Sequence, residues 1–127
     1  MKVRRDPETV HPPLAAYAHQ IEVSGERLLV MSGQIGAGLD GSVPAGALDQ
    51  LAAALENVRR NLDAAGMGLG DLVKLTIYLV GEVDTVARRA LVERWLGPER
   101  PCMTVVYVSA LASPALKVEV DAWAAAS

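Results

Sequence analysis

One strand-like segment carries charged residues at alternate positions. In the sequence "KVEVDAW", Lys117, Glu119 and Asp121 alternate with Val118 and Val120. Because successive side chains of a β-strand point to opposite faces, the three charged residues share one face and the valines share the other. A carboxylate held in a cleft can act as a general base, so Glu119 is a candidate for handling a proton or a water molecule. The alternatives are a solvated strand face and an ion pair between Glu119 and Lys117.

The other side chains capable of chemistry are few and scattered. The single cysteine, Cys102, has no base next to it in the sequence, so a nucleophilic role is unsupported. His11, His19 and Cys102 do not have the spacing of metal ligands, and the sequence therefore predicts no metal site. His19 follows Tyr17 by two residues and would share its face if both lay on a strand. We interpret His19 as a surface or hydrogen-bonded structural residue, the alternative being a second base.

Length and composition limit the class of protein. The 127 residues fit one domain, 1–127, in which the polar residues 1–13 form an N-terminal arm. The net charge of −3 offers no basic surface for nucleic acid. No apolar run has the length of a membrane span, and the N-terminus lacks the apolar core of a signal peptide. With a single cysteine, these features predict a cytoplasmic protein.

Hydrophobic periodicity and turn residues predict the elements that must position these side chains. We expect a hairpin in which "HQIEV" and "RLLVMSG" flank Ser24-Gly25. The next predicted elements are a first helix from Ala47, a strand 72–80, a second helix 86–96, a strand 103–109 and a last strand 116–123. The first helix has an apolar stripe and a stop at Gly66, and the second has a cap at Asp84 or Thr85 and a stop at Gly97.

The predicted order is ββαβαββ, an α+β fold with a mixed sheet and both helices on one face. The segments "VKLTIYLV" and "MTVVYVS" carry apolar residues on both sides, whereas two helices cover only one face. The second face must therefore be buried in another way. We expect a homo-oligomer that packs sheet against sheet and places a site between subunits.

Three segments in order resemble the RidA/YjgF family of reactive intermediate deaminases. They are "HPPLAAYAHQIEVSGERLLVMSGQIG", "LENVRRNLDAAGMGLGDLVKLTIYL" and "VVYVSAL" followed by "KVEVDAWA", which together span residues 12–124. The resemblance implies a chorismate-mutase-like fold and a homotrimer with a central barrel and three clefts between subunits. It also implies hydrolysis of 2-imino or 2-enamino acids to 2-keto acids and ammonia, with no cofactor.

The sequence departs from that family at one position. Active deaminases carry "Pro-Ala-Arg-Ser" before the fourth strand, and their arginine holds the substrate carboxylate. The ungapped register places Pro101, Cys102, Met103 and Thr104 on this motif, so the arginine position is Met103. An alternative register aligns Arg100 with the arginine and needs three inserted residues. Loss of a bidentate guanidinium should weaken carboxylate binding at least about tenfold, whereas methionine suits an uncharged or aromatic ligand.

Other family positions carry over to this chain. The resemblance implies a water-activating role for Glu119, a place in the cleft for Tyr17, and donors to the substrate from Ser32 and Gly33. Arg89 stands where the family often has asparagine and is either a displaced positive charge or part of a solvated helix face. The expected catalytic residues are Glu119 and Tyr17, and the expected substrate-binding residues are Ser32, Gly33, Met103, Val105 and Arg89.

Three functions fit this sequence. The first is an enzyme that hydrolyses or tautomerises a reactive imine, enamine or secondary-metabolite intermediate outside the standard 2-imino acids. The second is a standard deaminase in which Arg89 or Arg100 supplies the missing charge. The third is a non-catalytic trimer that binds a small ligand or acts like a chaperone. A ribonuclease ranks last, because the chain is acidic.

Overall fold

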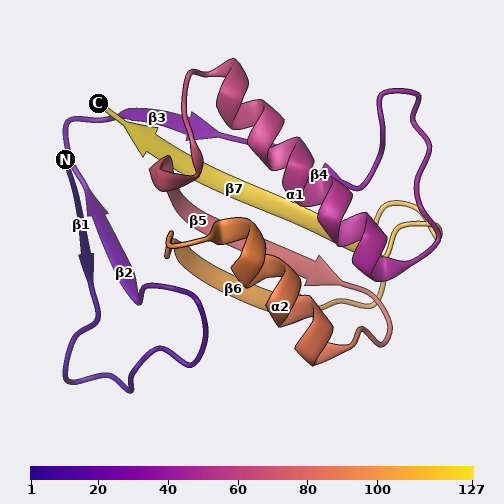
Figure 1. Ribbon diagram of the computed structural model, residues 1–127, viewed down its shortest axis with the longest axis horizontal. Coiled ribbons are helices and arrows are strands. Elements are labelled where there is room, and N and C mark those ends of the chain that lie inside the picture. The colour runs from indigo at the N-terminus through magenta and orange to yellow at the C-terminus, as the bar shows by residue number, and fades with distance from the viewer.

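A computed structural model describes residues 1–127 and shows one main sheet with a helical layer on one side (Figure 1). Two short strands, β1 (Lys2–Arg5) and β2 (Gln20–Val23), pair with each other beside the main sheet. The main sheet contains β3 (Arg27–Val30), β4 (Gln34–Ile35), β5 (Leu72–Leu79), β6 (Cys102–Tyr107) and β7 (Val118–Ala126). The helices are α1 (Ala47–Ala64), the one-turn 3₁₀ helix η1 (Leu69–Asp71) and α2 (Thr85–Leu96).

The strand order of the main sheet is β3-β7-β5-β6, and β4 also pairs with β7. Strands β5 and β6 are parallel, as expected for a pair joined by a helix, whereas β7 is antiparallel to its neighbours. Helices α1 and α2 lie on the same face of the sheet (Figure 1). The α+β fold predicted from the sequence is confirmed, with β1 and β4 as additional short strands.

Helix α1 buries the apolar stripe that its sequence predicts. Leu51, Leu55, Val58 and Leu62 are fully buried and recur at steps of three and four, so they lie on one side of the helix and face the sheet. After the helix, Gly66 adopts a φ of 69°, a left-handed conformation that a side chain would disfavour.

Helix α2 starts and ends at the predicted signals. The Asp84 side chain accepts a hydrogen bond of 2.8 Å from the Ala87 amide, and Gly97 ends the helix with a φ of 60°. Only Val92 and Leu96 are buried, so this helix presents a narrow apolar edge to the sheet. Trp95 packs partly against the core, with the Arg59 guanidinium of α1 5.8 Å from its ring centre.

The predicted hairpin between residues 19–23 and 27–33 is wrong. Although Gly25 makes a turn with a φ of 64°, β2 pairs with β1, and β3 pairs with β7. Each of the two strands therefore pairs with a partner from elsewhere in the chain and not with the other. Residues 1–13, predicted as a polar arm, contain β1, and Lys2 Nζ donates to the Ala125 carbonyl of β7 at 2.7 Å.

Gln50 positions the start of β7, although it is a polar residue buried inside the helical layer. Its Nε2 donates to the carbonyls of Pro44 and Ala115 at 2.8 and 3.0 Å, and its Oε1 accepts from the Lys117 amide at 2.8 Å. A buried amide with all these partners satisfied rigidly joins α1 to the segment that precedes Glu119.

The face of the sheet opposite the helices is uncovered and mixed in character. Leu28, Val30 and Trp123 expose 59%, 55% and 42% of their surface on it. Glu119 and Asp121 of β7 share this face, while Val118, Val120 and Ala122 of β7 are fully buried under the helices, as their alternation predicts. Neither α1 nor α2 combines the length and apolar character needed to cross a bilayer.

Candidate functional site

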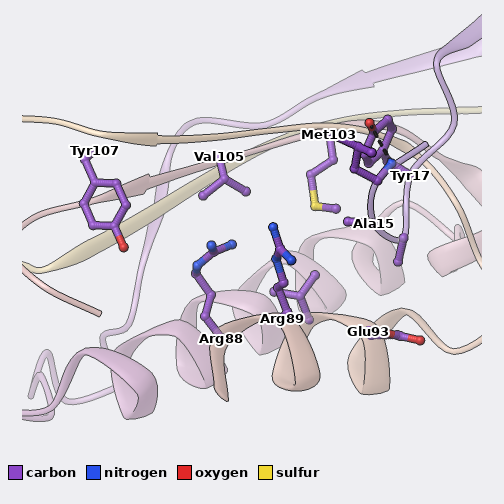
Figure 2. Close-up of a pocket in the computed structure, with 11 residues that line it drawn as sticks. Ala15, Tyr17, Arg88, Arg89, Glu93, Met103, Val105 and Tyr107 are labelled. Carbon is purple, nitrogen blue, oxygen red and sulfur yellow. Dashed lines mark hydrogen bonds between the residues drawn. The ribbon is translucent and has the colours of Figure 1, made fainter. Parts of the chain in front are cut away.

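A cavity of about 520 Å³ lies between helix α2, strand β6 and the turn that precedes β2 (Figure 2). This volume is typical of small-molecule sites. Most of the wall is apolar, and the charged residues in it come from the helix. The lining residues are Leu14, Ala15, Ala16, Tyr17, Arg88, Arg89, Val92, Glu93, Met103, Val105 and Tyr107.

Strand β6 directs Met103 and Val105 toward the helices. In the parallel pairing with β5, Met103 lies opposite Leu75 and Val105 opposite Ile77, both fully buried on the helix side. Residues opposite each other on neighbouring strands share a face, so Met103 and Val105 form the sheet-side wall of the cavity. In Figure 2 the Met103 sulfur points toward α2. The thioether and the valine give this wall no charge.

Arg88 and Arg89 form the opposite wall, and their side chains extend from α2 toward β6 (Figure 2). Neither guanidinium makes an ion pair within the chain. The Arg88 Nε atom is in addition buried without a hydrogen-bond partner. Arg89 lines the cavity and is also exposed to solvent, so both interpretations that the sequence left open describe part of its surroundings.

Arg88 is the positively charged lining residue that the sequence did not identify as a site residue. It precedes the buried Val92 and Leu96 by four and eight residues, so the three lie on one helix face. This spacing was a usable signal, because it extends the buried edge of α2 by one turn.

Glu93 is the one acidic residue in the cavity wall, and it does not neutralise the arginines. It follows Arg89 by four residues, a spacing that permits an ion pair on a helix, yet no such pair is present. Figure 2 shows its carboxylate directed away from both guanidinium groups. The Asp84 carboxylate, four residues before Arg88, is engaged by the Ala87 amide. The helix wall therefore carries two positive charges without a counter-charge.

Tyr17 closes one end of the cavity from a turn rather than from a strand. Its hydroxyl accepts a hydrogen bond of 3.1 Å from the Leu14 amide and keeps its own proton for a further acceptor. The ring meets His19 edge to face, with 5.5 Å between ring centres. His19 Nε2 lies 2.6 Å from the His11 carbonyl oxygen, so His19 holds the N-terminal turn together and does not line the cavity.

Glu119 and Gly33 meet on the other face of the sheet. Glu119 pairs with Tyr78 of β5 and with Ile35 of β4, which places its side chain on the uncovered face. Gly33 lies beside it, and a Cβ atom added to Gly33 would overlap the Glu119 carboxylate. Ser32 is an exposed neighbour in the same turn. Lys117 precedes β7 and makes no ion pair with Glu119, so of the two alternatives for this glutamate the solvated strand face is the one that is left.

A second carboxylate on this face is occupied by a tyrosine. The Tyr78 hydroxyl donates to Asp121 Oδ2 at 2.8 Å. This bond, with burial and the charges of Asp121 and Glu119, raises the pKa of Tyr78 above its usual value, so the phenol stays protonated. Asp121 is thus committed to Tyr78, and Glu119 is the carboxylate of this pair that has no hydrogen-bond donor in the chain.

Two other residues considered from the sequence, Arg100 and Cys102, belong neither to the cavity wall nor to the carboxylate pair on the uncovered face. Arg100 Nη1 donates to the carbonyls of Gly97 and Glu99 at 2.7 and 2.8 Å, so this guanidinium fastens the end of α2 and does not reach the cavity. Burial raises the pKa of the Cys102 thiol, with nearby Lys74 acting in the opposite direction. No three metal-ligating side chains lie together.

The expected site residues therefore divide between two faces of the sheet. Tyr17, Arg89, Met103 and Val105 line the cavity under α2, as the structure shows, together with Arg88. Ser32, Gly33 and Glu119 lie outside that cavity. Within a single chain, the candidate base and the candidate binding pocket are not brought together.

Comparisons with known proteins give a consistent result. The family model "Endoribonuclease L-PSP" matches residues 8–126. A RutC family protein of Pyrococcus horikoshii is 30% identical over 119 residues, covering 91% of this chain and 90% of the relative. A Rid family protein of unknown function from Yersinia pestis, YyfB, has a TM-score of 0.87 at 27% identity, covering 97% of both chains. Escherichia coli TdcF, solved with bound serine, has a TM-score of 0.73 at 27% identity, covering 98% of this chain and 96% of TdcF.

Proposed function

The chain belongs to the RidA/YjgF (endoribonuclease L-PSP) family, and from this premise we propose that it acts on a small reactive intermediate in a cleft between the subunits of a homotrimer. The observation that carries this proposal is the cavity of about 520 Å³ whose wall contains Met103, Val105, Tyr17 and Arg89. Its size suits a metabolite, and the serine bound to the E. coli relative TdcF supports a small-molecule ligand.

The trimer is supported by the chemistry of the uncovered sheet face. Leu28, Val30 and Trp123 expose apolar surface there, and contiguous apolar surface on a soluble domain marks an interaction site. The division of the site points the same way, because Met103 and Glu119 lie on opposite faces. A second copy that packs on the open face could bring its own Glu119 to the edge of the first copy's cavity.

The proposed reaction is hydrolysis of a carbon–nitrogen double bond. Water adds to the carbon of the protonated imine while Glu119 accepts one of its protons, which forms a neutral carbinolamine. Glu119 then returns this proton to the nitrogen, and the carbon–nitrogen bond breaks as the hydroxyl group releases its proton to solvent, giving ammonia and a carbonyl. Without water addition, the same glutamate would tautomerise an enamine by accepting the nitrogen proton and returning it to the β-carbon. We propose a substrate other than the standard 2-imino acids, because no arginine stands at position 103.

A non-catalytic binding trimer is the second candidate, and one observation favours it. The cavity of a single chain contains no free general base, since Tyr17 is engaged by its own turn and Glu93 is directed away. Such a protein would retain a ligand without turnover. A ribonuclease is not favoured, because the chain carries a net charge of −3.

The test compares turnover in the wild type, Glu119→Gln and Met103→Arg. Amine oxidases generate imines without a carboxylate, amino-acid oxidases generate the standard 2-imino acids, and a suitable lyase generates 2-aminoacrylate. Ammonia release is followed for each imine. Glu119→Gln should lower turnover by about 10²- to 10⁴-fold, because it removes the proton acceptor while keeping the shape. Met103→Arg should increase activity toward the carboxylate-bearing imines.

Sedimentation of each variant is the control for assembly. Full activity of Glu119→Gln in an intact oligomer would remove the proposed mechanism. Absence of turnover for every imine, with a small molecule that co-purifies, would favour the binding trimer.

A further inference from the structure

We infer that Arg88 and Arg89 form a subsite for a doubly charged anionic group, so that the ligand of this cavity is a small organic dianion with an apolar body. Two kinds of ligand fit this description, a phosphate monoester and a compact dicarboxylate, and both carry two negative charges close together. This inference deepens the proposed function, since it assigns a substrate class to the same cavity. It concerns binding and can be measured without turnover.

The first support is the balance of charge in the cavity wall. Arg88 and Arg89 contribute two positive charges, and neither has an ion-pair partner within the chain. The carboxylate of Glu93 points away from them, and the wall contains no other acidic side chain. Two neighbouring cations on one helix repel each other, and an apolar cavity strengthens that repulsion. A dianion would neutralise both charges, whereas a single carboxylate would leave one without a counter-charge.

The second support is the number of unused hydrogen-bond donors. A guanidinium has five N–H donors in a planar fork, and neither of these two donates a hydrogen bond within the chain. The Arg88 Nε atom is moreover buried without any acceptor, which destabilises the site unless a ligand supplies one. One carboxylate accepts about four hydrogen bonds, so a phosphate or a second carboxylate matches the two forks better.

The third support is the uneven distribution of polarity across the cavity. The charges lie on the α2 wall, whereas Met103 and Val105 make the β6 wall apolar. A ligand should therefore place its anionic group against the helix and its apolar body against the strand. The charge that the sequence resemblance expected on the strand at position 103 is thus supplied from the helix, by two residues instead of one.

The experiment measures binding of four probes to the wild-type protein by isothermal titration calorimetry at pH 7.5. Phenyl phosphate and phenylsuccinate are dianions from the two chemical sources, phenylacetate is the matching monoanion, and benzyl alcohol is the neutral control. We expect at least one dianion to bind about tenfold or more tightly than phenylacetate, and benzyl alcohol to bind weakest. The tighter of the two dianions identifies the source, phosphate or dicarboxylate.

The variants Arg88→Gln and Arg89→Gln should each weaken binding of that dianion by about tenfold or more, since each loses charged hydrogen bonds. Arg94→Gln is the matched control, because Arg94 is on the same helix and outside the cavity wall. Arg88→Lys keeps the charge without the fork and should fall between wild type and Arg88→Gln. Thermal unfolding checks that each variant folds.

Two results would overturn the inference. One is phenylacetate binding as tightly as both dianions, and the other is unchanged dianion affinity in Arg88→Gln and Arg89→Gln. Failure of the proposed catalysis has a different signature, since Glu119→Gln would then keep wild-type turnover while dianion binding still depended on Arg88 and Arg89.

Discussion

The two faces of strands β5, β6 and β7 carry opposite chemistry. On the helix side, Arg88 and Arg89 face Met103 across the cavity. On the uncovered side, Glu119 and Asp121 lie among exposed Leu28 and Trp123. One face has binding groups and volume but no free base, and the other has a carboxylate but no enclosing wall. In a single chain the cavity and this carboxylate lie on opposite faces, so under the proposed function they would meet only through assembly.

A charge introduced on the uncovered face should have the largest effect. Leu28→Lys would bury an ammonium group without a partner in the proposed trimer interface, which costs several kcal/mol. We expect the association to weaken at least about a hundredfold, measured by sedimentation over a range of concentrations. Leu39→Lys is the matched control, because Leu39 is an equally apolar residue that is 108% exposed in a loop. An intact oligomer in Leu28→Lys would show that this face is not the interface.

A smaller effect should separate the two faces by function. Gly33→Ala would place a methyl group where the Glu119 carboxylate now lies and displace it. We expect turnover to fall about tenfold, since a small misplacement of a reacting group is costly, while probe binding in the Arg88–Arg89 cavity stays unchanged. Gly68→Ala is the control, because its added methyl group meets open space. Equal losses in both variants would indicate a general effect on folding.

The smallest expected effect concerns stability of the uncovered face as a function of pH. Tyr78→Phe removes the hydrogen bond to Asp121 and should lower the free energy of unfolding by about 1 kcal/mol at pH 7. Because the pKa of Tyr78 is raised in the folded state, its stabilisation is fully present below the unfolded value near 10 and is lost as pH rises through the higher folded pKa.

Urea unfolding at pH 7, 9 and 11 tests this sign. The difference between wild type and Tyr78→Phe should be constant at the two lower values and shrink at the highest. A difference that grew with pH would contradict the assigned direction.

The sequence predicted those features that depend on local patterns. The stripe of α1, the cap at Asp84 and the stop at Gly97 each follow from a few neighbouring residues, and the structure confirms them. The alternation in β7 likewise separated Glu119 from Val118 and Val120. Local periodicity sufficed there because each element exposes one side and buries the other.

Features that depend on long-range partners were not accessible in the same way. The predicted hairpin was wrong because β2 pairs with β1 and β3 pairs with β7. The face of Met103 is set by its pairing with Leu75, about thirty residues earlier in the chain, so its separation from Glu119 could not be derived locally. Arg88 was missed for a different reason: α2 buries only Val92 and Leu96, and two residues make a weak stripe.

The placement of the tryptophans has an optical consequence. The chain has only two, and each belongs to a different layer: Trp95 on α2 beside Arg59, and Trp123 partly exposed on the uncovered sheet face. Indole emission moves to shorter wavelength as the ring leaves water. In the proposed trimer Trp123 would report on subunit contact, whereas Trp95 reports on whether α1 and α2 remain packed. One spectrum for each single-tryptophan variant would then distinguish dissociation from unfolding.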